Sequence, residues 1–380
     1  MASSLQSKIR VPIDWVVCAA GNSQRFRARG FTTAKPRLRL RGTSMLERAI
    51  SSLELLPQDQ VIVISRKADG VAGDLAGELR RRYPWVRFLF HELTRPTAGQ
   101  LATVLTAKHL LRKDAALAIW NCDTYFQSSE LLRHLRSLDG VDGIIPCAKA
   151  SGAAWSYVAS SREGFVTAIA EKKVISRDAT VGLYFFTDAR LFLRHAPRVV
   201  RESRGKEAYV SFLYDELLRL GHRIRAVGCD VFLPFGTPEQ VRRYWQVTPE
   251  QLRAENPAGV IVVDLDGTLT VDDKDLSYAD KKPRPEVIRR LRHYKARGYQ
   301  IIVHTARNMK TRGGDEAQVI AHVGADTLRW LRKHRVPFDG IRFGKPFARE
   351  GFYLDDRAVR PSEFLAYSEE AIGALLRREA

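Results

Sequence analysis

The chain has 380 residues, of which 45% are hydrophobic and 28% are charged, and its formal net charge is +19. This length predicts two or three domains, and the composition is that of an ordinary soluble protein. No apolar run approaches the roughly 20 residues that a membrane-spanning helix needs, and the polar stretch Met1–Arg10 lacks the apolar region of a signal peptide. The cysteines Cys18, Cys122, Cys147 and Cys229 are widely spaced, which argues against a disulfide framework or a zinc site and favours reduced thiols in the cytoplasm.

The strongly basic charge balance admits two interpretations. It fits a nucleic-acid or anionic-surface binder, and it equally fits an arginine-rich protein that acts on small anionic substrates. Basic residues are scattered, with local clusters such as Arg80–Arg82, and no basic run is interleaved with aromatic residues as a single-strand-binding surface requires. We therefore expect small anionic substrates and no nucleic-acid partner.

The first part of the chain alternates strand and helix patterns. Strands are expected at 14–19, 61–65, 86–90 and 115–120, and helices at 45–56, 73–83 and 100–111, with a polar, glycine-containing loop up to about residue 34. This βαβα order predicts a mostly parallel sheet. Further strands are expected at 156–159, 166–170, 180–187 and 223–227, and helices at 189–202, 209–220 and 238–245.

The stretch 247–258 is polar and contains Pro249 and Pro257, so it predicts a linker. The βαβ pattern restarts after it. We therefore expect a domain at 1–246 and a second domain at 259–380.

A polar loop with a glycine and an arginine directly follows the first expected strand. It runs Ala19-Ala20-Gly21-Asn22-Ser23-Gln24-Arg25-Phe26, and Lys35-Pro36 comes soon after it. Backbone N–H groups of such a loop can surround phosphates, and Arg25 and Lys35 can neutralise a triphosphate. The loop resembles the signature of nucleotidyltransferases with a glycosyltransferase-A-like (GT-A-like) fold, the sugar-nucleotide pyrophosphorylases.

Other segments extend this resemblance over about residues 12–245. Thr97-Ala98-Gly99-Gln100 falls where those enzymes contact the base, and Asn121-Cys122-Asp123 falls where they place a metal-binding aspartate at a strand end. The resemblance implies that Asp123 binds Mg²⁺, a cation that prefers oxygen ligands, and that Glu171-Lys172 holds the sugar phosphate. The segments Trp155–Val158, Ala179–Tyr184 and Phe235–Glu239 are similar to a branch found in surface-polysaccharide gene sets.

One position departs from the family pattern. Pro234-Phe235 stands where better-known pyrophosphorylases have a second metal-binding aspartate just before a late Gly-Thr. Asp230 lies upstream as a possible substitute. Because of this departure, a second interpretation stays open, in which the N-terminal domain binds a nucleotide without catalysing a reaction.

The second expected domain opens with Asp264-Leu265-Asp266-Gly267-Thr268 after the apolar run 260–263. Carboxylates at i and i+2 at the end of a strand point the same way, so one can attack a phosphoryl group while the other moves a proton. Further motifs follow expected strands at 301–303, 341–343 and 351–354. They are His304-Thr305-Ala306-Arg307, Gly344-Lys345-Pro346 and Asp355-Asp356.

These four ordered motifs resemble the haloacid dehalogenase (HAD) superfamily of phosphatases over about residues 259–367. The resemblance implies that Asp264 is the nucleophile, that Asp266 protonates the leaving oxygen and then activates water, and that Thr305 hydrogen-bonds the phosphoryl group. It further implies that Lys345 neutralises charge, and that Asp355, with Asp356, binds Mg²⁺ together with Asp264 and the Asp266 carbonyl group.

The intervals between these motifs are too short for a cap domain. They hold expected helices at 285–298 and 325–334 and loops at 271–283 and 308–315, so we expect an open site. Tyr278, Arg307 and Asn308–Lys310 are candidates for substrate contact, or for plain structural roles.

The expected fold is α/β, with two Rossmann-like three-layer α/β/α domains: a GT-A-like nucleotidyltransferase fold followed by a capless HAD fold. The expected function is bifunctional and Mg²⁺-dependent. One domain transfers a nucleotidyl group from a nucleoside triphosphate to a sugar or polyol phosphate, and the other hydrolyses a phosphomonoester, in the synthesis of a surface polysaccharide. The alternatives are a phosphatase with a non-catalytic nucleotide-binding domain and a nucleic-acid end-processing phosphatase.

Overall fold

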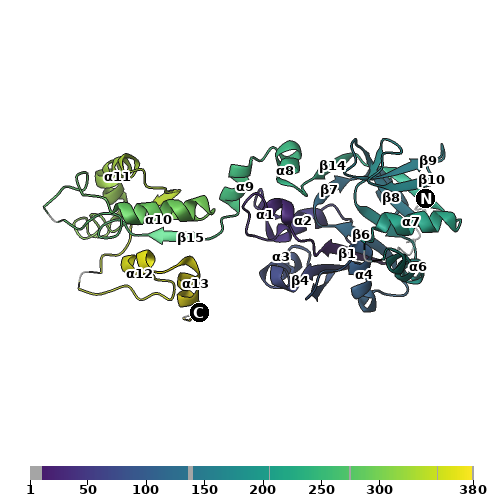
Figure 1. Cartoon of the computed structure of the whole chain (residues 1–380), viewed down its shortest axis with the longest axis horizontal. Coiled ribbons are helices and arrows are strands. Elements are labelled where there is room, and N and C mark those ends of the chain that lie inside the picture. The colour runs from purple at the N-terminus through teal and green to yellow at the C-terminus, as the bar shows by residue number, and fades with distance from the viewer. Residues whose placement is uncertain (1–10, 136–139, 205, 274, 349, 379–380) are drawn as a thin grey trace, which may run out of the picture. The chain divides into compact units, whose positions relative to one another are not determined.

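The computed structural model of the chain describes residues 11–135, 140–204, 206–273, 275–348 and 350–378 (Figure 1). The described residues form two compact units. The first contains residues 11–29 and 33–255, and the second contains residues 30–32 and 256–378. No helix in these ranges combines the length and the apolar character needed to span a bilayer.

A ten-stranded mixed sheet is the centre of the first unit. Its path order is β10-β9-β11-β8-β12-β6-β1-β4-β5, with β13 paired to β8. The pairs among β1, β4, β5 and β6 are parallel, as is the pair β13–β8, whereas β8 to β12 pair antiparallel. The strands are β1 (Ile13–Ala19), β4 (Gln60–Arg66), β5 (Arg87–Leu93), β6 (Ala116–Asn121), β8 (Gly143–Lys149), β9 (Ser156–Ser160), β10 (Val166–Glu171), β11 (Asp178–Thr180), β12 (Leu183–Phe186) and β13 (Ile224–Gly228).

Helices cover both faces of this sheet. Val16 of β1 lies in a buried core with Leu101 of α4 and Phe192 of α6, while its neighbour Trp15 is also buried, on the opposite side of the strand. On that side the Trp120 indole N–H donates to the carbonyl of Ala49 in α2. The helices of the unit are α1 (Gln24–Arg27), α2 (Met45–Ile50), α3 (Asp74–Arg82), α4 (Gln100–Thr106), α5 (Ser129–His134), α6 (Ala189–Glu202), α7 (Val210–Arg219), α8 (Pro238–Trp245) and α9 (Pro249–Glu255).

Short elements complete the first unit. The strands β7 (Thr124–Gln127) and β14 (Val231–Pro234) pair antiparallel, as do β2 (Arg39–Leu40) and β3 (Thr43–Ser44). Single 3₁₀ turns form at η1 (Lys35–Arg37), η2 (Lys67–Asp69) and η3 (Lys108–Leu110). Strand β7 follows β6 after only two residues, the second of which is Asp123.

The second unit is built on a three-stranded parallel sheet in the order β15-β16-β17. The strands are β15 (Val260–Val263), β16 (Gln300–His304) and β17 (Gly340–Arg342), and the helices are α10 (Pro285–Ala296), α11 (Glu316–Lys333), α12 (Pro361–Ala366) and α13 (Glu369–Arg378). Leu291 of α10 and Trp330 of α11 pack in one core with Ile301 and Val303 of β16. These βα repeats place the carboxyl ends of all three strands at the same edge of the sheet.

Several elements of the first unit differ from those expected. The helix expected at 45–56 ends at Ile50, because the Ser51 hydroxyl donates to the carbonyl of Arg48 and the Ser52 hydroxyl accepts from the N–H of Phe126. The strand expected at 180–187 is two strands, β11 and β12, separated at Val181-Gly182. Both pair with β8, but β11 also pairs with β9 and β12 with β6. The segment expected as a linker contains helix α9.

Two differences concern the second unit. Helix α11 starts at Glu316 rather than near 325, because Asp315 caps it by accepting from the N–H of Gln318. The strand expected at 351–354 is absent, and this expectation was wrong for this structure. Phe352 and Leu354 are 85% and 93% exposed, and the Gly351 N–H turns back to the carbonyl of Ala348.

Candidate active sites

The carboxyl ends of β1 and β6 bring the first group of predicted residues together. These strands pair in parallel with Cys18 opposite Asn121, so the loop after β1 and the segment 121–123 leave the sheet side by side. Ala20, Gly21 and Asn22 lie on that loop, and Arg66 of β4 donates to the Asn22 side chain. The predicted phosphate-binding loop and the predicted metal-binding aspartate therefore share one edge of the sheet.

An ion pair joins Lys35 to Asp123 at this edge. The Lys35 ammonium lies 2.7 Å from Asp123 Oδ2, and its side chain is 16% exposed. The backbone N–H of Lys35 donates to the Ser23 hydroxyl, which fastens η1 to the loop. Burial acts to lower the pKa of Lys35, but the Asp123 carboxylate and Cys122 outweigh it, so the pKa is raised and the ammonium stays charged. Arg25 lies near enough for its charge to oppose this increase.

The segment 97–100 reaches the same edge through Gln100. Its amide donates to Asn121 Oδ1 at 2.9 Å, whereas the Thr97 hydroxyl bonds the Thr103 hydroxyl. Gly99 has a φ of +102°, and a Cβ there would lie 2.5 Å from the backbone nitrogen of Ala208. Gly99 is therefore required by the packing of this loop, whether or not it also contacts a base.

Glu171 and Lys172 form a separate group at the end of β10. The Glu171 carboxylate accepts from the hydroxyls of Ser156 and Ser211. Lys172 adopts φ +53°, and its ammonium lies over the ring of Tyr209 and donates to the Tyr209 hydroxyl. This hydrogen bond raises the pKa of Lys172. Within the described part of the chain, no hydrogen bond or ion pair joins Glu171 or Lys172 to Asp123. The sequence pattern did not indicate Tyr209 or Ser211.

The departure at Pro234-Phe235 has a definite geometry. In the β7–β14 pair Pro234 lies opposite Thr124, and the Phe235 N–H donates to the carbonyl of Asp123 at 2.9 Å. The chain therefore passes beside Asp123 without offering a carboxylate there.

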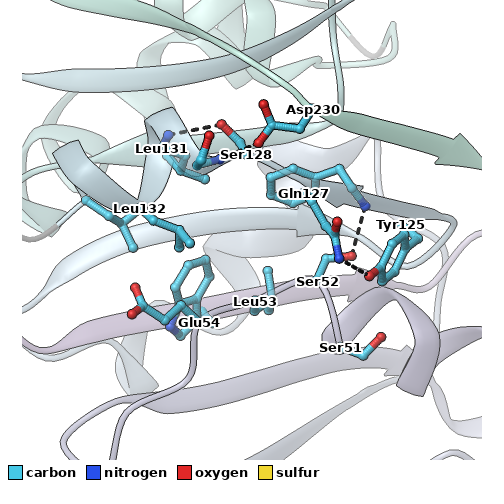
Figure 2. A pocket seen from close by; sticks show the side chains of 14 residues that line it. Ser51, Ser52, Leu53, Glu54, Tyr125, Gln127, Ser128, Leu131, Leu132 and Asp230 are labelled. Atoms are coloured by element: carbon cyan, nitrogen blue, oxygen red, sulfur yellow. Dashed lines mark hydrogen bonds between the residues drawn. The ribbon is translucent and has the colours of Figure 1, made fainter.

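Asp230 does not fill this gap. It lies at the other end of the pair, where its N–H donates to the carbonyl of Gln127 and its carboxylate accepts from the N–H of Ser129. There it lines a cavity of about 390 Å³ together with Ser128, Gln127 and Tyr125 (Figure 2). The structure thus removes Asp230 as the substitute metal ligand.

The second unit gathers its predicted residues at the carboxyl ends of its three strands. The Lys345 ammonium lies 3.0 Å from Asp264 Oδ1. The Lys345 N–H donates to the carbonyl of Thr305, which is fully buried. Asp264, Thr305 and Lys345, which follow three different strands, therefore meet at one point.

Asp266 is held by cations on both sides. The Arg307 Nε and Nη2 atoms donate to its two carboxylate oxygens at 2.9 and 3.0 Å, and Lys281 lies 3.3 Å away. The Arg307 side chain is 0% exposed, and Tyr278 packs on its guanidinium. Of the two roles considered for Arg307, substrate contact or a structural one, the structure shows it as a partner of Asp266.

Asp355 and Asp356 stay apart from these residues. Asp355 Oδ1 accepts from the backbone N–H of Arg357, and both aspartates are exposed. Across the described ranges, no three His, Cys, Asp or Glu side chains gather in a group that could hold a metal ion. The predicted four-part metal site is therefore not assembled, because the strand that should position Asp355 is missing.

Comparison with known proteins finds a matching family and several similar structures. Residues 15–179 match the family described as the MobA-like NTP transferase domain. The nucleoside-diphosphate-sugar pyrophosphorylase from Vibrio cholerae RC9 is 24% identical, with a TM-score of 0.53, over 61% of this chain and 99% of that chain. The inositol-1-phosphate CTP transferase from T. maritima is 13% identical, with a TM-score of 0.50, over 63% of this chain and 96% of that one.

A structural-genomics target from Vibrio cholerae is 44% identical over 32% of this chain and 99% of that chain, with a TM-score of 0.31. A search of curated proteins found no significant match. At identities below 25%, the pyrophosphorylase and the CTP transferase share a fold with this chain. The family match over residues 15–179 indicates a MobA-like NTP transferase domain in that part of the chain.

Proposed function

We propose that the first unit transfers a nucleotidyl group from a nucleoside triphosphate to a sugar or polyol phosphate and releases pyrophosphate. The observation that carries this proposal is the Lys35–Asp123 pair beside the loop 20–26, at the carboxyl edge of a sheet with the fold of known nucleotidyltransferases. The similar structures are those of a nucleoside-diphosphate-sugar pyrophosphorylase and an inositol-1-phosphate CTP transferase, which supports an acceptor of this class.

Each group of residues has a separate role in this reaction. Backbone N–H groups of Ala20, Gly21 and Asn22 hold the triphosphate, and Arg25 and Lys35 offset its negative charge. An oxygen of the acceptor phosphate then attacks the α-phosphorus, and the bond from that phosphorus to the leaving pyrophosphate breaks. Thr97 and Gly99 belong to the segment proposed to contact the base.

The acceptor is proposed to bind near Lys172. Its ammonium is exposed at the surface of the Tyr209 ring, where it can contact a phosphate, and Glu171 is fixed by two serines to accept from a sugar hydroxyl.

Asp123 is suited to hold Mg²⁺ in this site. It is a carboxylate beside the phosphate-binding loop, and Gly236, which has no side chain, lets its Oδ2 atom lie close to the backbone. A bound Mg²⁺ would stabilise the charge of the phosphates during transfer.

We propose that the second unit is a HAD-type phosphatase. Asp264 attacks the phosphorus of a phosphomonoester, the bond to the leaving oxygen breaks, and Asp266 gives that oxygen a proton. Water then attacks the aspartyl-phosphate, Asp266 takes its proton, and phosphate leaves. Thr305 and Lys345 lie where they can hold the transferring group, which supports this assignment.

Completion of this site requires Asp355 and Asp356 to approach Asp264. Within the described residues β15 has a strand on one side only, and Val260 and Val262 on it are 54% and 62% exposed. Pairing of 351–354 along this open edge would cover apolar side chains of both segments and bring Asp355 to the end of β15, where it could share Mg²⁺ with Asp264 and Asp266.

Together the two activities would make an activated precursor for a surface polysaccharide in the cytoplasm. The decisive experiment is ³¹P NMR of the full chain with Mg²⁺, each nucleoside triphosphate in turn, and a pool of sugar and polyol phosphates. Asp264→Asn is run in parallel. Pyrophosphate and a new diester signal that survive Asp264→Asn are expected.

Two other outcomes have definite meanings. Inorganic phosphate alone, lost in Asp264→Asn, would leave the phosphatase and make the first unit a nucleotide-binding domain, a role that the Pro234-Phe235 departure favours. Phosphate release that Asp264→Asn leaves unchanged would refute the proposed phosphatase mechanism.

A further inference from the structure

Gly236 allows two side-chain oxygens to approach the same point. A Cβ on Gly236 would lie 2.7 Å from Asp123 Oδ2 and 3.2 Å from Gln240 Oε1. Gly236 does not have the left-handed backbone that often explains a glycine. The approach of a carboxylate oxygen and an amide oxygen to this one point of the backbone is therefore the feature that needs an explanation.

The surrounding backbone fixes this arrangement. The hydrogen bond from the Phe235 N–H to the Asp123 carbonyl holds the chain beside the aspartate, and α8 begins immediately afterwards. The Thr237 hydroxyl accepts from the N–H of Gln240 and caps the helix. Gln240 thus lies in the first turn of α8, on the side that faces Asp123.

The ordinary explanation for Gln240 is helix capping. In the pattern Thr237-x-x-Gln240 the glutamine side chain usually accepts from the backbone N–H of the threonine. Across the described ranges only the threonine half of this exchange is formed, and the Gln240 amide oxygen instead lies near the same point beside Gly236 as Asp123 Oδ2. An amide oxygen is a neutral, hard ligand of the kind that Mg²⁺ accepts.

We propose that the Gln240 amide oxygen is the second protein ligand, beside Asp123, of the divalent cation in the first unit. The inference rests on the nucleotidyltransferase function proposed above. Gln240 supplies an oxygen that Pro234-Phe235 does not. Because Lys35 already pairs with Asp123, a neutral second ligand leaves more of the cation's charge for the phosphates.

The test measures Mn²⁺ binding directly, by the electron paramagnetic resonance signal of free Mn²⁺. The full chain carries Asp264→Ala, and the site in the first unit is defined as the binding that a further Asp123→Ala removes. In this background Gln240→Asn shortens the side chain by one methylene and withdraws the amide oxygen. We expect it to weaken Mn²⁺ binding roughly 10-fold, the lower end of the range seen when a residue that supports a metal site is removed.

The matched control is Gln246→Asn, the same change at an exposed glutamine just beyond α8. It should bind Mn²⁺ like the parent chain. Thermal unfolding of both variants is measured as well, because a residue that only caps the helix would lower the unfolding temperature and leave Mn²⁺ binding unchanged. That result would overturn the inference.

Asp123→Ala and Gln240→Asn together separate a failure of Gln240 as a ligand from a failure of the metal site itself. If Asp123→Ala abolishes binding but Gln240→Asn binds normally, Gln240 is not a ligand and the proposed function stands. If Asp123→Ala binds Mn²⁺ like its parent, the metal site of the proposed function is refuted, and the role of Gln240 is refuted with it.

Discussion

The conservative substitution Arg307→Lys tests how the second unit controls Asp266. Lysine keeps the positive charge but cannot donate to both carboxylate oxygens, as the Arg307 Nε and Nη2 atoms do at 2.9 and 3.0 Å. Asp266 would then be free to rotate toward Lys281, the other cation beside it. We therefore expect a loss of both stability and catalysis.

The magnitudes follow from the contacts. Hydrogen bonds to charged groups contribute about 1.5–3 kcal/mol each, and lysine replaces one of the two, so the second unit should lose about 2 kcal/mol and unfold roughly 5–10 °C lower. Removing one partner of a fully buried ion pair costs roughly 3–5 kcal/mol of stability. Asp266 is 25% exposed, so the stability lost in Arg307→Lys should be smaller than that. A proton donor displaced by about 1 Å costs on the order of 100-fold in rate.

The assay compares two phosphomonoesters. An alkyl phosphate needs Asp266 to protonate its leaving oxygen, whereas p-nitrophenyl phosphate has a leaving group that departs without a proton. Arg307→Lys should therefore reduce kcat on the alkyl phosphate by roughly 10- to 100-fold and on p-nitrophenyl phosphate much less. The control is Arg329→Lys, at an exposed pair with Asp326 on α11.

Two results would refute this reasoning. Equal losses on both substrates would show that Arg307 does not act through the proton-transfer role of Asp266. Unfolding at the wild-type temperature would show that the paired hydrogen bonds contribute nothing to the stability of the unit.

Three further predictions concern both units. Lys35→Met should lower pyrophosphate formation roughly 100- to 1000-fold, because it removes a positioned cation from the phosphate site, while phosphate release by the second unit persists. Gly99→Ala should destabilise the first unit by about 3 kcal/mol in urea unfolding, because the new Cβ would lie 2.5 Å from the Ala208 nitrogen and the φ of this residue favours glycine. The control Gly21→Ala should leave the stability unchanged, because no atom lies within 4 Å of its Cβ. Burial, together with the charge of Lys345, lowers the pKa of His304 below its ordinary 6.5, so the unfolded chain binds this proton more readily and stability should fall as the pH drops below about 6.5. His304→Gln should remove that part of the decrease between about pH 7.5 and about pH 5.5, and an unchanged decrease would contradict the assignment.

Local signals in the sequence were enough to predict elements whose determinants are themselves local. Helix α6 has the predicted bounds because Asp188 caps its first turn, and α8 does because Thr237 caps it with a proline at the first position. Apolar β-branched runs likewise predicted β1, β4 and β16 to within a residue or two. Because parallel strands end at a common edge, the motifs that follow them were expected to share a site in each domain, and the structure brings Lys35 to Asp123 and Lys345 to Asp264.

Other features depend on partners that are distant along the chain. The Asn121 amide lies 2.3 Å from the Cβ that Gly182 lacks, and the break between β11 and β12 lies at that glycine. The 351–354 segment matches the strand pattern but pairs with no strand among the described residues, because strand formation requires hydrogen bonds that a sequence pattern does not supply.

The order of residues along the chain was enough to predict which carboxylates, cations and glycine turns follow which strands. How those groups pair with one another depends on the tertiary structure. It turned Arg307 from a candidate substrate contact into the partner of Asp266, moved Asp230 to a different cavity, and brought Gln240 beside Asp123. The physical reason is that a side chain's charge and hydrogen-bonding capacity belong to the residue, whereas the group that it meets is set by packing between elements far apart in the chain.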